Sequence, residues 1–252
     1  MPRFAANLTL LFTEYPFLER FAEAGAAGFE WVEVQFPYDD AAPEILRRMQ
    51  AAGVRMALIN CPPPNYTGGA RGFAAVPGSE ARFEKDFTRA LRYAQRLGAQ
   101  HLHIMAGEAE GPQARETFVR NLAWAAAQAP DQSLTIEPIN PQDMPAYFLN
   151  DYDLAAEVIA QVNAPNLGLQ FDAYHAQIIT GDAQATWQRF APIIRHIQIA
   201  SPPDRHEPAQ GAIDFKALFA AIDASGYDGF ISAEYHPAKR TADGLAWLAQ
   251  YS

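Results

Sequence analysis

Four acidic or amide residues stand at the ends of short apolar runs, about one strand-and-helix unit apart along the chain. They are Glu137, Asp172, Gln198 and Glu234. Three carboxylates and one amide oxygen form a set of hard ligands, which suits Mg²⁺ or Mn²⁺ far better than a soft metal. The sequence therefore predicts a divalent metal site made of these four residues, with Mg²⁺ and Mn²⁺ both open.

Glu137 and Glu234 also have the chemistry of a proton-transfer pair. One carboxylate would remove a proton from the carbon beside a carbonyl, and the other would return a proton to the neighbouring carbon. A cation that binds the carbonyl oxygen and the adjacent hydroxyl would stabilise the enediolate between these steps. The alternative is structural: each strand-terminal acid caps a helix or pairs with a cation in a loop.

The rest of the chain predicts a fold that brings these strand ends together. Eight apolar runs alternate with stretches of helical spacing, which argues for a parallel sheet. Eight such units in 252 residues fit a closed (β/α)₈ barrel, the TIM barrel, as a single domain over residues 1–252. The expected strands are residues 3–8, 31–36, 55–60, 101–105, 133–137, 167–172, 193–200 and 229–234, and the expected helices are residues 17–28, 43–53, 79–98, 116–129, 153–162, 182–191, 215–226 and 242–250.

Composition and charge exclude several classes of protein. The formal net charge of −10 argues against a nucleic-acid surface, because phosphate binding needs clustered Lys and Arg. No apolar run approaches the roughly 18–20 residues of a membrane span, so no membrane partner is expected. Cys61 is the single cysteine, and no cleavable secretion signal is visible, so a cytoplasmic location is expected. The stretch 61–78 is expected to be a lid or a subunit contact, which keeps a homo-oligomer open.

Four longer strings carry a resemblance to known proteins. TIEPINPQDMPAYFLN (135–150), QFDAYHAQ (170–177), HIQIASPPDRHEPAQGAIDF (196–215) and GYDGFISAEYHP (226–237) resemble the hydroxypyruvate isomerase family of xylose isomerase-like TIM barrels. Residues 3–21 and 31–39 fit as well, so the resemblance covers essentially the whole chain. It implies that Glu137 and Glu234 donate and accept the proton and bind a divalent metal, with Asp172 and Gln198 as the remaining ligands.

The resemblance implies an isomerase that interconverts hydroxypyruvate and tartronate semialdehyde through an enediolate. Related ketose 3-epimerases usually carry histidine at the position of Gln198, so the glutamine favours the hydroxypyruvate isomerase branch. The alternative is a 2-oxo-tetronate isomerase, because such sequences resemble the amino terminus and the PDRHEP stretch closely. The E-P-I-N-x-x-D-x-P segment places hydroxypyruvate first. Both substrates are small 2-oxo acids.

Three further residues are candidates for substrate contacts. His175 lies just beyond a strand end and is expected to hydrogen-bond a substrate oxygen, the alternative being a structural loop histidine. Arg205 has the planar guanidinium that suits a carboxylate, so it is expected to bind that group of the substrate. The alternative is a surface arginine that pairs with Asp204 or Glu207. Asp143 stands where related epimerases place an acid near the substrate, and it would equally serve as the cap of a turn.

His101 and His103 share one face of an expected strand, which invites a zinc site. No second cluster with zinc spacing accompanies them, so we expect them to pack against the helix layer. Three other functions stay open on the same barrel: a ketose 3-epimerase, a metal-dependent hydrolase or endonuclease, and a non-catalytic sugar-acid-binding protein. A hydrolase of this kind needs a histidine-rich site and a basic groove, and a binding protein has no need of two opposed carboxylates.

Overall fold

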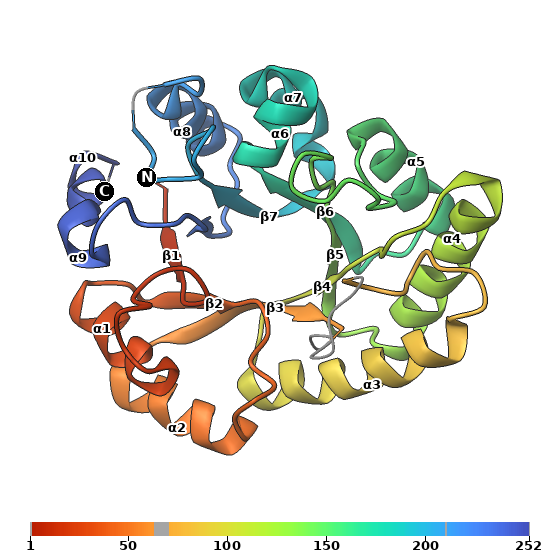
Figure 1. The fold of residues 1–252 in the computed structure, drawn as a ribbon, viewed down its shortest axis with the longest axis horizontal. Coiled ribbons are helices and arrows are strands. Elements are labelled where there is room, and N and C mark those ends of the chain that lie inside the picture. Colours follow the sequence, from red (N-terminus) through yellow and green to blue (C-terminus); the bar gives the residue numbers. More distant parts are fainter. Residues whose placement is uncertain (1, 63–70, 210, 252) are drawn as a thin grey trace.

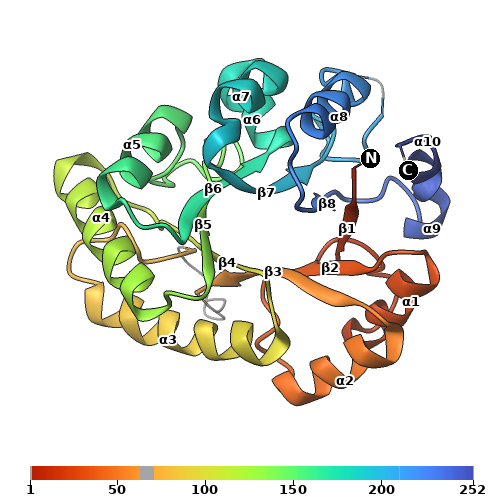
Figure 2. The ribbon, with the colours of Figure 1, turned by 180° about the vertical axis from the view of Figure 1, so that it is seen from behind.

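Eight short parallel strands form a closed barrel in the computed structural model, which describes residues 2–62, 71–209 and 211–251. The strands pair in sequence order, and β8 closes the ring on β1 (Figures 1 and 2). The expected TIM barrel is therefore confirmed. The strands are β1 Phe4–Asn7, β2 Trp31–Val34, β3 Arg55–Cys61, β4 His101–Ile104, β5 Ser133–Ile136, β6 Leu167–Asp172, β7 Ile194–Ile199 and β8 Ile231–Ala233.

Helices form a ring outside the barrel, as Figure 1 shows. Every expected helical stretch contains a helix, but the helix after β4 begins at Gly111 instead of residue 116, and the helix directly after Asp172 was not expected. The helical segments are η1 Phe17–Glu19, α1 Arg20–Ala26, α2 Ala42–Ala52, α3 Glu80–Leu97, α4 Gly111–Gln128, α5 Tyr152–Val162, α6 Ala173–Thr180, α7 Ala183–Phe190, η2 Ala191–Ile193, α8 Phe215–Ala224, α9 Thr241–Gly244, η3 Leu245–Trp247 and α10 Leu248–Tyr251.

Local chemistry sets where several helices begin and end. Asp151 starts α5 by accepting a hydrogen bond from the backbone N–H of Leu154 over 2.7 Å. Gly98 ends α3 with a φ of 65°, in the left-handed region that glycine adopts without steric cost. These signals are local, which explains why the sequence alone predicts these boundaries.

The inside of the barrel is apolar near one end and polar toward the other. Near the N-terminal ends of the strands, Ala5, Ala57 and Phe230 form a small buried cluster against Trp31. Farther along the strands, side chains at inward positions are polar and hydrogen-bond to one another across the barrel. The buried polar strand residues are Asn7, Glu33, Asn60, His101, His103, Thr135, Gln170, Asp172, His196, Gln198 and Ser232.

His101 and His103 belong to this interior, so the expectation that they pack against the helix layer is wrong. The His101 ring lies 5.3 Å from the His196 ring, and His103 Nδ1 lies 3.1 Å from Asn60 Oδ1. Successive strand residues point to opposite faces. The helix-facing positions of β4 are therefore its apolar residues, and both are part of the main core.

Two other expectations concern the outside of the molecule. Among residues 2–62, 71–209 and 211–251, every helix is too short or too polar to span a lipid bilayer. Of the stretch 61–78, residues 63–70 lie outside the described residues, so a lid or a subunit contact there stays a prediction.

Candidate active site

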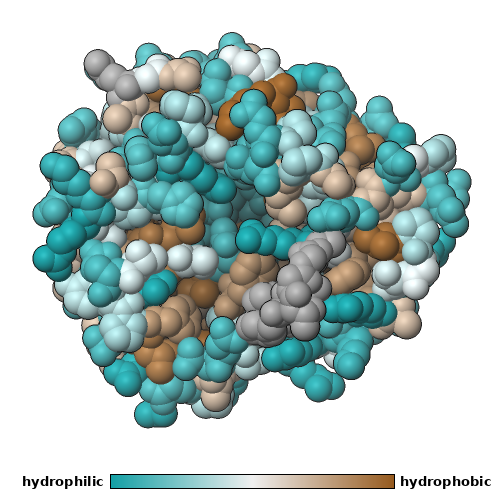
Figure 3. Space-filling model, in the orientation of Figure 1, coloured by the Kyte–Doolittle hydropathy of each residue, from teal (hydrophilic) through white to brown (hydrophobic). Residues whose placement is uncertain are grey.

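A cavity of about 430 Å³ opens at the C-terminal ends of the strands. Figure 3 shows the face of the molecule that is seen in Figure 1, hollowed near its centre and bordered there by hydrophilic side chains. Asp172 and Gln198 do not line the cavity but hydrogen-bond to residues that do. The structure thus brings all seven expected site residues together. Those that line the cavity are Glu137, Asp143, His175, Arg205 and Glu234.

Strand register explains this convergence. Glu137 directly follows β5 and Glu234 directly follows β8, whereas Asp172 is the last residue of β6. On β7, Gln198 is paired in register with Asp172. Because parallel strands of a barrel end at the same face, residues separated by up to about a hundred positions meet there.

Arg205 bridges two of the acids. Its Nη2 lies 3.1 Å from Asp172 Oδ2 and 2.6 Å from Glu234 Oε1. The Arg205 backbone adopts a φ of 55°, which costs an ordinary residue about 1–2 kcal/mol, and its carbonyl accepts a hydrogen bond from His236 N–H over 2.8 Å. The guanidinium is therefore aimed into the site, and the alternative of a surface arginine paired with Asp204 or Glu207 is not observed.

Asp172 has two roles at once. Its Oδ1 accepts a hydrogen bond from Tyr174 N–H over 2.9 Å and so caps α6, while its Oδ2 faces Arg205. The structural alternative for strand-terminal acids is thus correct for one oxygen of this residue. The other oxygen stays directed at the site.

The protonation of His175 follows from its neighbour Asn140. Asn140 Oδ1 accepts hydrogen bonds from the backbone N–H groups of Gln142 and Asp143, each over 3.0 Å. Its Nδ2 therefore faces His175 Nδ1, at 2.7 Å, and donates to it. Burial lowers the pKa of His175, so the ring is neutral and carries its single proton on Nε2.

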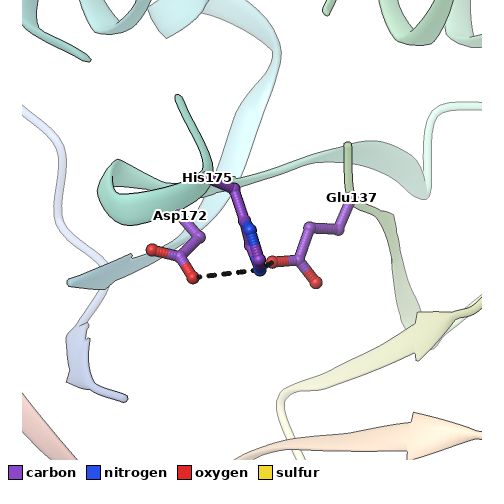
Figure 4. Close-up of side chains that lie close together, drawn as sticks. All are labelled: Glu137, Asp172 and His175. Carbon is purple, nitrogen blue, oxygen red and sulfur yellow. Dashed lines mark ion pairs between the residues drawn. The ribbon is translucent and has the colours of Figure 1, made fainter. Parts of the chain in front are cut away.

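His175 stands between two carboxylates, as Figure 4 shows. Its Nε2 lies 3.6 Å from Asp172 Oδ2 and 4.0 Å from Glu137 Oε1. One potential ligand atom from each of these three buried residues lies within 4.8 Å of the other two. The proton on Nε2 makes His175 a hydrogen-bond donor in this arrangement, which suits contact with a substrate oxygen.

Two glutamine side chains connect the remaining acids. Gln170 Nε2 donates to Glu137 Oε2 over 3.0 Å and to Gln198 Oε1 over 2.7 Å. Gln198 Nε2 in turn donates to Glu33 Oε1 over 2.6 Å and to Glu234 Oε2. Gln198 thus presents its N–H groups to the carboxylates, and the expected role as a metal ligand requires its amide to turn round.

Burial changes the pKa of the acids in the site. Desolvation raises the pKa of Glu137, and the neighbouring carboxylates Glu234 and Asp172 raise it further. Desolvation also raises the pKa of Asp172 and of Glu234, although the guanidinium of Arg205 opposes the increase in both. Beneath them, burial raises the pKa of Glu33 to about 7. The folded chain therefore retains protons here that an exposed acid would release.

The donor set fits a hard divalent cation. When Glu137, Asp172 and Glu234 are all ionised, the single charge of Arg205 leaves two negative charges in a buried space. A divalent cation with a preference for oxygen would balance this excess, and Mg²⁺ and Mn²⁺ both have that preference.

Sequence reasoning missed several residues of the site. Gln35 Nε2 donates to Glu234 Oε1 over 2.9 Å, and His103 Nδ1 lies 3.7 Å from Glu137 Oε2. Glu33 and Gln35 are polar residues two apart in an otherwise apolar strand region, which is the signal for inward-facing polar positions. Gln170 carries the same signal within β6, and Asn140 is part of the E-P-I-N segment.

The chain is similar to known proteins over its full length. Residues 19–251 match the family described as Xylose isomerase-like TIM barrel. A 2-oxo-tetronate isomerase from Cupriavidus necator is 47% identical, covering 100% of this chain and 99% of that protein. The hydroxypyruvate isomerase of Escherichia coli strain K12 is 38% identical, with full coverage of both chains.

A solved structure has almost the same shape. The crystal structure of a protein from Brucella melitensis, described as AP endonuclease, family 2, superposes with a TM-score of 0.96 and 42% sequence identity. The match covers 100% of this chain and 99% of that one. The names of these relatives span isomerases and an endonuclease, so the chemistry of this site has to decide between them.

Proposed function

The chain belongs to the family of hydroxypyruvate isomerases and 2-oxo-tetronate isomerases with a xylose isomerase-like TIM barrel, and we propose that it isomerises a short 2-oxo acid, with a 2-oxo-tetronate as the first candidate substrate. The supporting observation is the pair Glu137 and Glu234, whose carboxylates lie in one buried, hydrogen-bonded group at the mouth of the barrel. Both glutamates line a cavity of about 430 Å³, which is large enough for a small sugar acid.

The order of the two substrates differs from the sequence-based expectation. The E-P-I-N-x-x-D-x-P segment placed hydroxypyruvate first, but the relative named 2-oxo-tetronate isomerase is 47% identical and the hydroxypyruvate isomerase is 38% identical. Overall similarity weighs more than one segment, because substrate length depends on the whole wall of the pocket. Hydroxypyruvate is therefore the second candidate.

The residues of the site supply the proton transfer. One glutamate, as the carboxylate, accepts the proton from the carbon that bears the hydroxyl, which produces the enediolate. The other glutamate returns a proton to the former carbonyl carbon, and the hydroxyl proton passes to the former carbonyl oxygen, so that the hydroxyl and the carbonyl exchange places. His175 donates its Nε2–H to a substrate oxygen, and Asp143, at the edge of the cavity, contacts the substrate from the outer side.

Glu137, Asp172, Gln198 and Glu234 are the proposed ligands of a divalent cation, Mg²⁺ or Mn²⁺. When bound, such a cation polarises the carbonyl and the adjacent hydroxyl and thereby makes the neighbouring proton more acidic. Arg205 forms ion pairs with Asp172 and Glu234, two of these ligands. We expect the Gln198→Leu variant to bind the metal weakly, because leucine lacks the amide oxygen.

An endonuclease is the second hypothesis, because the Brucella protein is described as an AP endonuclease. Such an enzyme needs a site for several metals beside a basic groove. Among the described residues, one buried cluster with metal-ligand geometry occurs, and it contains a single histidine. The net charge of −10 also disfavours binding to a phosphate backbone. The site supports an isomerase better.

Proton NMR in D₂O tests the proposal. The protein is stripped of metal, reconstituted with Mg²⁺ or Mn²⁺, and given a 2-oxo-tetronate or hydroxypyruvate in separate tubes. We expect metal-dependent conversion with deuterium entering at the exchanging carbon. The Glu137→Gln and Glu234→Gln variants should each lose roughly 10²- to 10⁴-fold in turnover.

The matched control is Glu84→Gln on the exposed side of α3, which should turn over as the wild type does. Normal turnover by either active-site variant would contradict the enediolate scheme. If neither acid is converted while metal is bound, the result would favour a ketose 3-epimerase or a sugar-acid-binding protein. Cleavage of DNA that contains abasic sites would support the endonuclease.

A further inference from the structure

The charges around the cavity are unequally distributed. Four acidic side chains but only two cationic ones line it among the described residues. A negatively charged substrate therefore depends on the two arginines or on a bound cation. The charged lining residues are Glu108, Glu137, Asp143 and Glu234, with Arg71 and Arg205.

Arg205 is already engaged at the reacting centre. Its Nη2 contacts Asp172 and Glu234, and its side chain is only 18% exposed. Both partners belong to the acidic group whose charge it balances. A substrate carboxylate at Arg205 would have to compete with two buried carboxylates, which makes Arg205 a poor binding site for the anionic end of the substrate.

Arg71 differs in both respects. It lines the same cavity from the segment that leads toward α3, and its side chain reaches solvent. Within residues 2–62, 71–209 and 211–251, no ion pair of Arg71 is observed. Of the two arginines that line the cavity among the described residues, Arg71 is therefore the one whose guanidinium is available to an incoming anion.

The backbone beside Arg71 is held in place by a close crossing of two glycines. Gly72 pairs with Ala106 in an antiparallel bridge just beyond β4, and its φ is 103°. A Cβ atom at Gly72 would lie 2.4 Å from Met105 O, and a Cβ atom at Gly107 would lie 2.4 Å from Gly72 O. Since only glycine permits this approach at either position, the start of the arginine side chain is anchored at the rim of the cavity.

We propose that Arg71 binds the carboxylate of the substrate and so makes the site selective for short acids over neutral ketoses of the same length. The inference rests on the proposed isomerase function and adds to it the residue that recognises the acid. A guanidinium binds a carboxylate with two parallel hydrogen bonds, which fixes the orientation of the molecule as well as its charge. The carbonyl end of the substrate then points toward Glu137 and Glu234.

Equilibrium binding of non-isomerisable analogues tests this role apart from turnover. Glycerate and erythronate carry the carboxylate but no ketone, and glycerol and erythritol are their neutral counterparts. Each is titrated by calorimetry into the Mg²⁺-loaded wild type, Arg71→Gln, Arg71→Lys and the control Arg92→Gln, which removes an exposed arginine from α3.

We expect the wild type to bind the acids in preference to the polyols. Arg71→Gln should weaken acid binding roughly 10- to 100-fold, the range for hydrogen bonds to a charged group, without changing polyol binding. Arg71→Lys should recover part of the affinity, and Arg92→Gln should match the wild type. In kinetic assays with the true substrate, Arg71→Gln should raise KM and largely retain kcat.

Several outcomes would overturn the role of Arg71. They are unchanged acid binding by Arg71→Gln, equal loss of acid and polyol binding, and no preference for acids in the wild type. Failure of the isomerase proposal is distinguishable from these. If the wild type binds the acids through Arg71 but shows no deuterium exchange with either 2-oxo acid, the result would support the carboxylate site and contradict the isomerase function.

Discussion

Gln170 donates a hydrogen bond to the amide oxygen of Gln198 over 2.7 Å, so the two side-chain amides are arranged in series. The sense of the series is fixed from one end, where Thr135 Oγ1 donates to Gln170 Oε1 over 2.9 Å. As a result Gln170 offers its N–H groups to Glu137, and Gln198 offers its own to Glu234. Until the amide of Gln198 turns to bind a metal, one continuous chain of hydrogen bonds therefore orients the two proposed proton-transfer residues.

Replacement of Gln170 by methionine should impair the site without unfolding the barrel. Methionine has a similar volume but cannot donate to Glu137, and a buried acceptor that loses its donor costs about 1–3 kcal/mol. We expect a kcat reduction of roughly 10- to 100-fold and weaker Mg²⁺ binding by calorimetry. Thr135→Val removes the hydroxyl that donates to Gln170 and should cause a smaller change of the same kind. Thr135→Ser keeps the hydroxyl and should behave as the wild type does. A Gln170→Met enzyme with wild-type kcat and metal affinity would remove the amide series from the mechanism.

Asn140→Leu should change the protonation pattern of His175. The substitution removes the side-chain donor at 2.7 Å and leaves His175 Nδ1 with only the longer bond of 3.4 Å from the backbone N–H of residue 140, so the preference of the neutral ring for the Nε2–H tautomer weakens. We expect ¹⁵N NMR of histidine-labelled protein to show His175 as the Nε2–H tautomer in the wild type and as a mixture in the variant. Turnover should fall in parallel. A single unchanged tautomer in both proteins would mean that Asn140 does not control the ring.

The stability of the metal-free protein should decrease as pH rises from about 6.5 to about 8. In this window the folded chain retains protons on Glu33, whose pKa is raised to about 7, and on the coupled acids above it, while the unfolded chain has released them. The unfolded state therefore binds fewer protons, and the free energy of unfolding falls with increasing pH. Below about pH 6.5, the buried histidines have the opposite effect, and the free energy of unfolding rises with increasing pH. The reason is that the pKa of His103 and of His196 is lowered to about 3, so the unfolded chain binds protons that the folded chain does not.

Thermal unfolding in EDTA at pH 6.5 and at pH 8 measures this effect. Added Mg²⁺ or Mn²⁺ should restore stability mainly at pH 8, where the carboxylates that bind it are ionised. The Glu33→Gln variant should show a weaker dependence on pH than the wild type. A Tm in EDTA that rises between these two pH values would contradict the assignment of raised pKa values to these acids.

Gly72→Ala should destabilise the protein more than Gly78→Ala. Both glycines have a positive φ, of 103° and 81°, so both substitutions introduce backbone strain of about 1–2 kcal/mol. At Gly72 the new Cβ would also lie 2.4 Å from Met105 O, whereas at Gly78 nothing lies within 4 Å. Urea unfolding measures the loss of stability in each variant, which comes from backbone strain alone in Gly78→Ala and from strain plus a steric clash in Gly72→Ala. Equal losses would show that the glycine crossing is not tight in solution.

The barrel and the proposed reacting acids could be predicted because both depend on local patterns. Apolar runs and helical spacing gave the order of strands and helices, and parallel strands then require Glu137, Asp172 and Glu234 to meet at one face. The helix α6 escaped prediction because it begins immediately after Asp172, with no intervening turn to mark it. The early start of α4 at Gly111 reflects Pro112 in its first turn, which lies before the apolar pattern begins.

The sequence by itself determined the fold type, the positions of the strand-end acids and the similarity to sugar-acid isomerases. Only the tertiary structure decided which side chains support them. Gln35 meets Glu234 across 199 positions of the chain, and His196 meets Glu33 across 163. Such contacts depend on strand register and on which face of a strand points inward, and no local signal encodes the partner. The same holds for Arg71, since its place at the cavity is set by the crossing of two glycines that belong to different loops.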